Sequence, residues 1–187
     1  MGKLHEKIDD KMRHFIESQR MFFVATAPSG SEGHVNLSPK GLDSFRVLDS
    51  KTVAYLDFIG SGAETIAHLR ENGRIVIMMC AFEGPPRIVR FYGSGEVVEP
   101  EDASFRDLRP LFPGSDVARA IIRVEVNRIA DSCGHGVPVY EYRQDRPQLF
   151  DWADRKGEQG RIRYQREKNS QSIDGLPALR WPDEQSG

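Results

Sequence analysis

Cysteine is scarce in this 187-residue chain, which contains only Cys80 and Cys133. Two cysteines are too few for the disulfide framework of a small secreted domain. No apolar run approaches the ~20 residues needed to span a bilayer, and the first residues are charged rather than apolar. We therefore expect a cytoplasmic protein with no membrane association.

A strong excess of charge of either sign is also absent, because 26 lysine and arginine residues stand against 28 aspartate and glutamate residues. This near balance argues against a nucleic-acid-binding protein, whose contacts with phosphates favour a basic surface. The length suits one compact domain that buries a substantial core, with room for an appended tail.

Several motifs of catalysis are missing. The sequence has no Gly-x-Ser-x-Gly elbow, no P-loop and no dinucleotide-binding fingerprint. Cys133-Gly134-His135 offers two residue types that bind metals, but no second cluster of cysteine or histidine completes a site. We expect no metal centre.

Apolar periodicity predicts a mainly β fold of the α+β class. The expected strands cover residues 21–27 and 34–38 (a hairpin), 45–48, 52–58, 74–82 (buried on both faces), 87–98 and 120–129, and helices are expected at 5–18 and 102–111. Strict alternation of strands and helices is missing, which favours an antiparallel barrel with packed helices. Gly93 and Gly95 predict a bend or bulge.

A mid-chain helix is predicted after Gly60. Ser61 and Glu64 have the spacing of a capping box, and Gly73 supplies the helix stop. Polar residues dominate beyond position 145. We expect a barrel domain at residues 1–145 and a helical or extended tail at 146–187, packed on the barrel or on a partner subunit.

Three polar segments are candidates for ligand binding. If the strand continues through Pro39, Asn36, Ser38 and Lys40 project to one side, where an ammonium group would suit a phosphate. The alternative is a solvent-facing strand end that leads into a turn. The helix start at residues 60–65 would also attract an anion, unless Ser61 is occupied as an N-cap. Arg87 and Arg90 lie on opposite faces of their strand, and either is a candidate ligand residue or a plain surface arginine.

These segments, in this order, resemble the pyridoxamine 5'-phosphate oxidase-related family of FMN-binding split β-barrels. The resemblance covers roughly residues 22–142 and includes Asn36-Leu37-Ser38-Pro39-Lys40-Gly41, the approach to the helix at 56–62 and the strand segment at 90–93. The segments at 131–138 and 172–177 are similar to those of an uncharacterised subgroup. The resemblance implies FMN bound at the interface of a homodimer, so that one copy offers half a site. The positions that match the family's cofactor contacts are Asn36, Leu37, Ser38, Lys40, Leu56, Asp57, Ser61, Gly62, Thr65, and Arg87 or Arg90.

The resemblance implies an FMN-dependent oxidoreductase that acts on a small molecule. Gly62-Ala63 stands where pyridoxamine phosphate oxidases carry an Arg-Lys pair, and their basic C-terminal segment has no clear counterpart, which puts vitamin B6 oxidation in doubt. The alternatives are a flavin-binding sensor without catalysis, a split barrel that binds haem or a deazaflavin, and a dimerisation module without a cofactor. His135 would be an axial-ligand candidate in the haem case.

Overall fold

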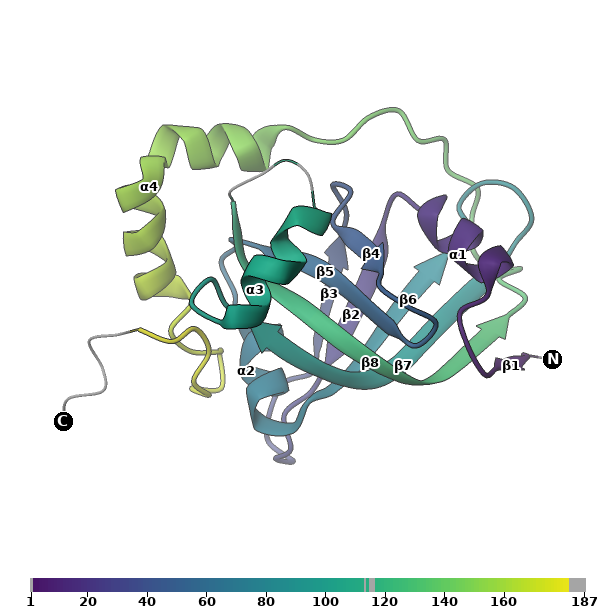
Figure 1. Ribbon diagram of the computed structural model, residues 1–187, viewed down its shortest axis with the longest axis horizontal. Coiled ribbons are helices and arrows are strands. Elements are labelled where there is room, and N and C mark those ends of the chain that lie inside the picture. Colours follow the sequence, from purple (N-terminus) through teal and green to yellow (C-terminus); the bar gives the residue numbers. More distant parts are fainter. Residues whose placement is uncertain (1, 113, 115–116, 182–187) are drawn as a thin grey trace.

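The computed structural model describes residues 2–112, 114 and 117–181 (Figure 1). In this part of the chain the elements follow one another as β1 (Leu4–His5), α1 (Asp10–Glu17), β2 (Phe22–Thr26), β3 (Asn36–Lys40), β4 (Phe45–Val47), β5 (Thr52–Phe58), α2 (Glu64–Asn72), β6 (Arg74–Cys80), β7 (Ile88–Val98), α3 (Ala103–Leu108), the 3-10 helix η1 (Arg109–Leu111), β8 (Ala118–Ser132) and α4 (Gln148–Lys168). No helix among these has both the length and the apolar character required to cross a membrane.

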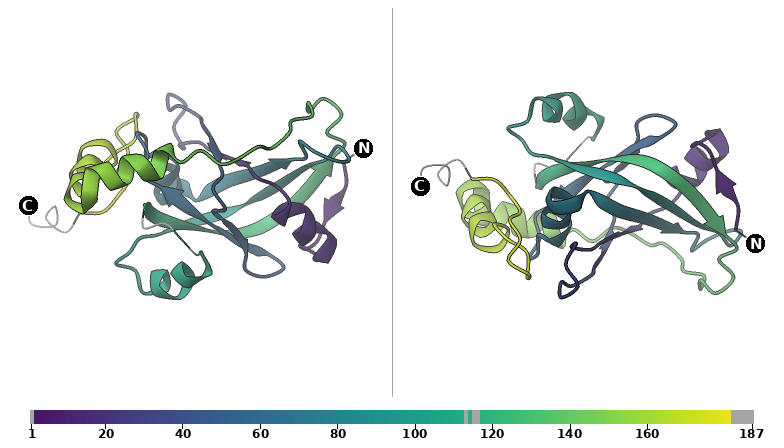
Figure 2. Two further views of the ribbon diagram at one scale, coloured as in Figure 1. Left: turned by 90° about the horizontal axis from the view of Figure 1, so that it is seen from above. Right: turned by 90° about the horizontal axis from the view of Figure 1, so that it is seen from below.

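The strands form one antiparallel sheet that curls on itself. Its strand order is β3-β2-β6-β7-β8-β5-β4, and β1 pairs with β8. β2 and β5 are not neighbours in this order, yet the rings of Phe22 and Tyr55 lie 5.4 Å apart across the interior. The antiparallel split β-barrel that the sequence predicts is therefore confirmed, with helices around its outside (Figures 1 and 2).

The inside of the barrel holds the main hydrophobic core. Side chains that alternate along the strands point inward, and Val24, Ile77, Phe91 and Ile122 are completely buried. The hairpin of β2 and β3 pairs Phe22 with Lys40 and Thr26 with Asn36. Because paired residues share a face of the sheet, Asn36 and Lys40 are directed to the inner side.

The outer face of β6 corrects one expectation. The sequence predicts that residues 74–82 are buried on both faces, and this is wrong. Ile75, Ile77 and Met79 are buried, whereas Val76 and Met78 are only half-buried. The alternation arises because β6 packs against the core through one face and leaves the other on the outside of the sheet. Apolar residues on that outer face therefore remain available for contact.

The N-terminal helix begins later than the helix predicted at residues 5–18. Leu4 and His5 pair with β8 as a short strand, and α1 begins at Asp10. Asp9 stops the helix from extending further back, because its side chain accepts a hydrogen bond from the Met12 backbone N–H (2.8 Å) as an N-cap. Gly73, in contrast, ends α2 in the left-handed conformation (φ 70°), as predicted.

The chain beyond β8 crosses one side of the barrel. Residues 133–147, named here the strap, contain no helix or strand and lead from the end of β8 to α4 (Figure 2). α4 packs through Ala153 on Ile59 and Val117 and bends at Gly157. Residues 169–181 then return to the start of α2, where Asn169 Nδ2 donates a hydrogen bond to the Gly60 carbonyl (2.9 Å).

Gly93 marks the expected bulge, and its replacement tests the packing of β7 on β8. The pairing shifts register between Tyr92 and Gly93, and a Cβ at Gly93 would lie 2.2 Å from the Glu125 carbonyl oxygen. We expect Gly93→Ala to lower the free energy of unfolding by about 1–3 kcal/mol, measured by urea denaturation. Gly136→Ala is the control, because a Cβ there meets nothing within 4 Å. Equal unfolding midpoints for the two variants would contradict the packing argument.

Candidate functional site

Two cations and one carboxylate meet where the curled sheet closes. Lys40 ends β3, Asp57 lies near the end of β5, and Arg119 lies at the start of β8. Lys40 Nζ donates to Asp57 Oδ1 (2.6 Å), and Arg119 Nε donates to Asp57 Oδ2 (2.8 Å). Asp57 and Arg119 are both buried. Asp57 therefore links two strands that are not neighbours in the sheet.

The Asp57 carboxyl group is ionised near neutral pH. Burial alone would raise its pKa, but the charges of Arg119 and Lys40 outweigh burial and lower the pKa to about 2. Two cations around one carboxylate leave one positive charge in excess. The Lys40 side chain is 17% exposed and the Arg119 side chain 4%, so an anion would reach the cluster from the side of Lys40.

The loop before α2 is attached to this cluster. Arg119 Nη1 donates to the Gly62 carbonyl (2.8 Å), which brings the helix start and the charge cluster together. Ser61 is exposed beside Gly62. Asp57 and Arg119 thus connect Lys40 to the loop before α2 through hydrogen bonds.

The predicted capping box at this helix start is wrong. α2 begins at Glu64, its N-cap is Ala63, and no side chain caps it. The Glu64 carboxylate instead accepts the Ile173 backbone N–H (3.3 Å) and fills the space beside Gly62, where a Cβ would lie 2.3 Å from Oε2. The Ser61 hydroxyl is therefore not used as a helix cap, while Glu64 brings a negative charge to the helix start.

The polar residues of β3 lie on one side, as alternation along the strand predicts. Asn36, Ser38 and Lys40 are half-buried on the inner side, whereas Leu37 is 65% exposed on the other. Asn36 Nδ2 donates to Thr65 Oγ1 (3.0 Å), and Ser38 Oγ donates to Asn36 Oδ1 (2.9 Å). The structure thus brings together Asn36, Ser38, Lys40, Asp57, Gly62 and Thr65.

Other candidate residues lie apart from this group. The Leu56 side chain packs in a separate cluster with Val98 and Phe112, so only its backbone adjoins Asp57. Arg87 pairs with Asp131 (3.2 Å) and lies over the Phe15 ring. Arg90 is on the outer face of β7 and donates to Ser132 Oγ (3.2 Å).

The Cys133-Gly134-His135 motif forms a turn. Gly134 has φ 68° and packs on the Arg87 backbone, and its carbonyl accepts the Val137 N–H (2.9 Å). Cys133 and His135 are exposed. No group of three or more metal-binding side chains forms within the described residues.

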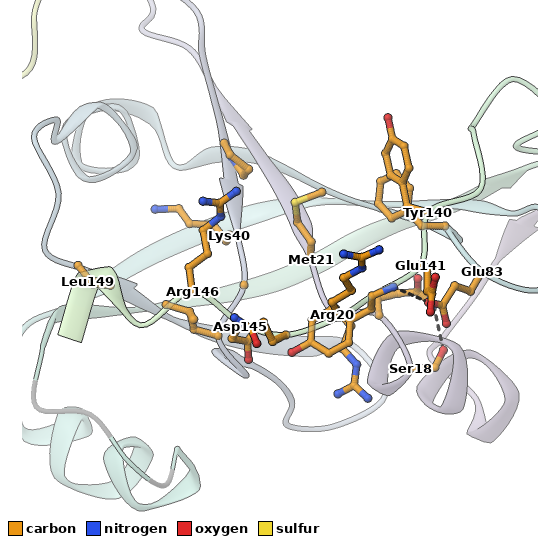
Figure 3. Close-up of a pocket in the computed structure, with 18 of the residues that line it drawn as sticks. Ser18, Arg20, Met21, Lys40, Glu83, Tyr140, Glu141, Asp145, Arg146 and Leu149 are labelled. Carbon is orange, nitrogen blue, oxygen red and sulfur yellow. Dashed lines mark hydrogen bonds between the residues drawn. The ribbon is translucent and has the colours of Figure 1, made fainter. Parts of the chain in front are cut away.

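A cavity of about 1010 Å³ lies between the strap and the ends of β2 and β3 (Figure 3). Lys40 and Met21 line it together with the strap residues Tyr140 and Arg146. The Tyr140 ring stacks on Phe82, with centroids 5.5 Å apart. Lys40 therefore contacts both the charge cluster and an open cavity whose walls carry aromatic side chains and charges of both signs.

Sequence reasoning missed three residues of the site: Arg119, Thr26 and His68. Thr26 Oγ1 lies 3.0 Å from Nδ1 of the fully buried His68, behind Asn36. No local motif marks these residues. The one available signal was Asp57, because a carboxylate within an apolar strand requires a buried cation from elsewhere in the fold.

Buried polar atoms without a partner surround the same region. In the described part of the chain they are the Tyr55 hydroxyl, His68 Nε2 and Asn169 Oδ1. Tyr55 lies two residues before Asp57, His68 contacts Thr26, and Asn169 bonds to Gly60. Such atoms are rare in folded proteins and each carries an energetic cost.

Comparison with known proteins finds one matching family model, a similar sequence and similar folds. The family model of pyridoxamine 5'-phosphate oxidase matches residues 8–133. The pyridoxamine 5'-phosphate oxidase family protein ustO of Aspergillus flavus is 40% identical over 196 residues, which cover 96% of this chain and 78% of that protein.

Solved structures show the same fold. A variant of HupZ from Group A Streptococcus is 28% identical, with a TM-score of 0.56, and the match covers 67% of this chain and 99% of that one. A Lactobacillus delbrueckii protein, provisionally named a pyridoxamine 5'-phosphate oxidase, has a TM-score of 0.50 at 16% identity, over 67% of this chain and 94% of that one. The second likeness concerns the fold alone.

The charge cluster predicts a specific acid sensitivity. The pKa of Asp57 in the folded state, about 2, lies below its ordinary value of 3.8. The stabilising contribution of Asp57, about 2 kcal/mol, is therefore complete above about pH 4 and is lost as the pH falls toward 2. We expect Asp57→Asn to remove this pH dependence and to lower stability at neutral pH by about 3–5 kcal/mol, because Arg119 stays buried without its partner and Lys40 loses its own.

Urea unfolding between about pH 5 and pH 2.5 measures both effects. Asp154→Asn, on the exposed side of α4, is the matched control. If Asp57→Asn keeps the wild-type dependence of stability on pH, the cluster does not have the charges assigned to it.

Proposed function

We infer that this chain, which belongs to the pyridoxamine 5'-phosphate oxidase family, is an FMN-dependent oxidoreductase that acts on a small molecule. The single observation that carries the proposal is the cluster of Lys40, Asp57 and Arg119 at the loop before α2. The charge of Lys40 and the N–H groups at the start of α2 suit a nucleotide phosphate, and the Glu64 carboxylate at the same helix start opposes them.

The residues of this site fit a flavin nucleotide. Lys40, Ser61 and Gly62 would hold the phosphate, and Asn36 with Ser38 would face the polar edge of the ring. A bound flavin would itself supply hydride or electron transfer, so the chain's own task is to bind and orient.

Gly62-Ala63 stands where pyridoxamine phosphate oxidases carry an Arg-Lys pair, and Arg119 supplies a positive charge near this position instead. The cation that this segment lacks comes instead from β8, since the Arg119 guanidinium reaches the Gly62 carbonyl. Arg180 near the C-terminus, in contrast, is held by Glu99 and Asp102. We therefore do not extend the proposal to vitamin B6 phosphates, and we assign the substrate to the cavity beneath the strap.

The partner in this proposal is a second copy of the chain. Phe23, Val76, Met78 and Tyr92 lie half-buried on the outer face of the sheet, and Leu37 is 65% exposed beside them. An apolar face of this kind is characteristic of an interface. Because β3 forms the edge of that face, a second copy that extends past this edge would adjoin Asn36, Ser38 and Lys40, which project from the inner side, and would complete the cofactor site.

Flavin binding tests the cofactor assignment. Protein mixed with FMN should retain the flavin through gel filtration and show its absorbance near 450 nm, roughly where oxidised flavins absorb. Lys40→Met should weaken FMN binding by about tenfold to a hundredfold, because it removes a charge-assisted contact to the phosphate. Lys51→Met, in the exposed turn before β5, is the control. Protein that binds no FMN, or a Lys40→Met variant with wild-type affinity, would disprove the assignment.

Light scattering tests the dimer. The wild-type protein should have twice the chain mass of 21.2 kDa. Leu37→Glu should dissociate it and weaken FMN binding at the same time, because a charge would be buried in the interface. Leu111→Glu alters a residue that is 45% exposed on η1 and should leave the mass unchanged. A monomeric wild-type protein that nevertheless binds FMN would rule out the shared site.

A further inference from the structure

A carboxylate occupies the side-chain space of Gly62 at the start of α2. A Cβ at Gly62 would overlap Glu64 Oε2 and would lie 3.4 Å from Oε1, so both oxygens lie against the open face of the glycine. Glu64 is half-buried there, and Ser61 beside Gly62 is exposed. The Glu64 side chain therefore folds back from the first turn of the helix toward the loop that precedes it.

No ion pair holds the carboxylate in this position. It accepts the Ile173 backbone N–H (3.3 Å) and forms no ion pair with any residue that the structure describes. The start of α2 itself favours the carboxylate, because no side chain caps the helix. Unpaired backbone N–H groups at a helix start carry partial positive charge and attract an anion. This helix start thus already has an anion, which the chain itself supplies.

The backbone of the loop before α2 is held from two sides. Asn169 Nδ2 donates to the Gly60 carbonyl (2.9 Å), and Arg119 Nη1 donates to the Gly62 carbonyl (2.8 Å). The Glu64 side chain, in contrast, has rotatable bonds and a partly open path to solvent. An anion that arrives at the helix start therefore meets a fixed loop and a carboxylate that can move.

We propose that Glu64 determines how strongly the site discriminates between phosphorylated and unphosphorylated flavins. Its carboxylate competes for the N–H groups at the start of α2, and a flavin phosphate that binds there must displace it. The inference rests on the proposed function and adds a specificity-determining residue to it. The competition reduces the advantage that a phosphate gains from the cations around Asp57 and makes FMN binding more readily reversible.

The experiment measures the affinities of FMN and riboflavin for the wild-type protein and for Glu64→Gln, by quenching of flavin fluorescence at one ionic strength. Glutamine keeps the shape of the side chain and an oxygen for the Ile173 N–H, but it has no charge. Glu64→Gln should bind FMN about tenfold more tightly than the wild type and riboflavin within about twofold, because only FMN carries the phosphate. Glu6→Gln removes the same charge at an exposed position between β1 and α1 and should change neither affinity.

Two further measurements separate charge from packing. Glu64→Asp keeps a carboxylate in the first turn of α2 and should keep a ratio of FMN to riboflavin affinity close to that of the wild type. Without ligand, Glu64→Gln should unfold in urea at a lower midpoint than the wild type, because the helix start loses its anion. Saturating FMN should remove or reverse this difference, since the phosphate then takes the same place.

The outcomes separate this inference from the proposed function. If the wild-type protein binds FMN and Glu64→Gln binds it no more tightly, or gains equally for riboflavin, Glu64 does not compete with the phosphate and only this inference is wrong. The same holds if Glu64→Asp gains as much as Glu64→Gln, or if unliganded Glu64→Gln unfolds at the wild-type midpoint. If neither the wild-type protein nor Glu64→Gln binds FMN, the proposed function falls and this inference falls with it.

Discussion

The carboxylate of Asp57 is the constraint on which the rest of the molecule depends. A fully buried carboxylate is costly unless cations satisfy it, and here the cations come from β3 and β8. The sheet must therefore curl until Lys40 reaches β5. The same contacts bring Arg119 to the loop before α2 and leave one positive charge in excess. Closure of the barrel and the proposed attraction for an anion thus depend on the same residues.

Side chains alternate between the inner and outer faces of the strands, and the two faces have different roles. Inward-facing residues build the core and, at β3, the polar wall formed by Asn36, Ser38 and Lys40. Outward-facing residues of β2, β6 and β7 leave an apolar surface on the other side of the same strands. The strap adds a cavity that Lys40 also lines. One edge strand therefore adjoins the core, the charge cluster and the face assigned to a second copy.

Local patterns in the sequence predicted the features that depend only on residues close together in the chain. The hairpin of β2 and β3, the stop at Gly73 and the bulge at Gly93 each follow from a few adjacent residues. Contacts between residues far apart in the sequence could not be predicted from such patterns. Arg119 and Asp57, which form a hydrogen bond, are 62 positions apart. The Ile173 backbone N–H, 109 positions from Glu64, donates to the Glu64 carboxylate, and the predicted capping box therefore does not form. The register of the sheet, rather than any motif, sets such pairs.

The central claim is that the charge cluster holds the phosphate of a flavin nucleotide. The most direct measurement is the affinity of the wild-type protein for FMN and for riboflavin, which has the same ring and ribityl chain but no phosphate, at one ionic strength. The account predicts that FMN binds at least about tenfold more tightly, since charge-assisted contacts to the phosphate exist for FMN alone. Equal affinities for the two flavins would contradict it.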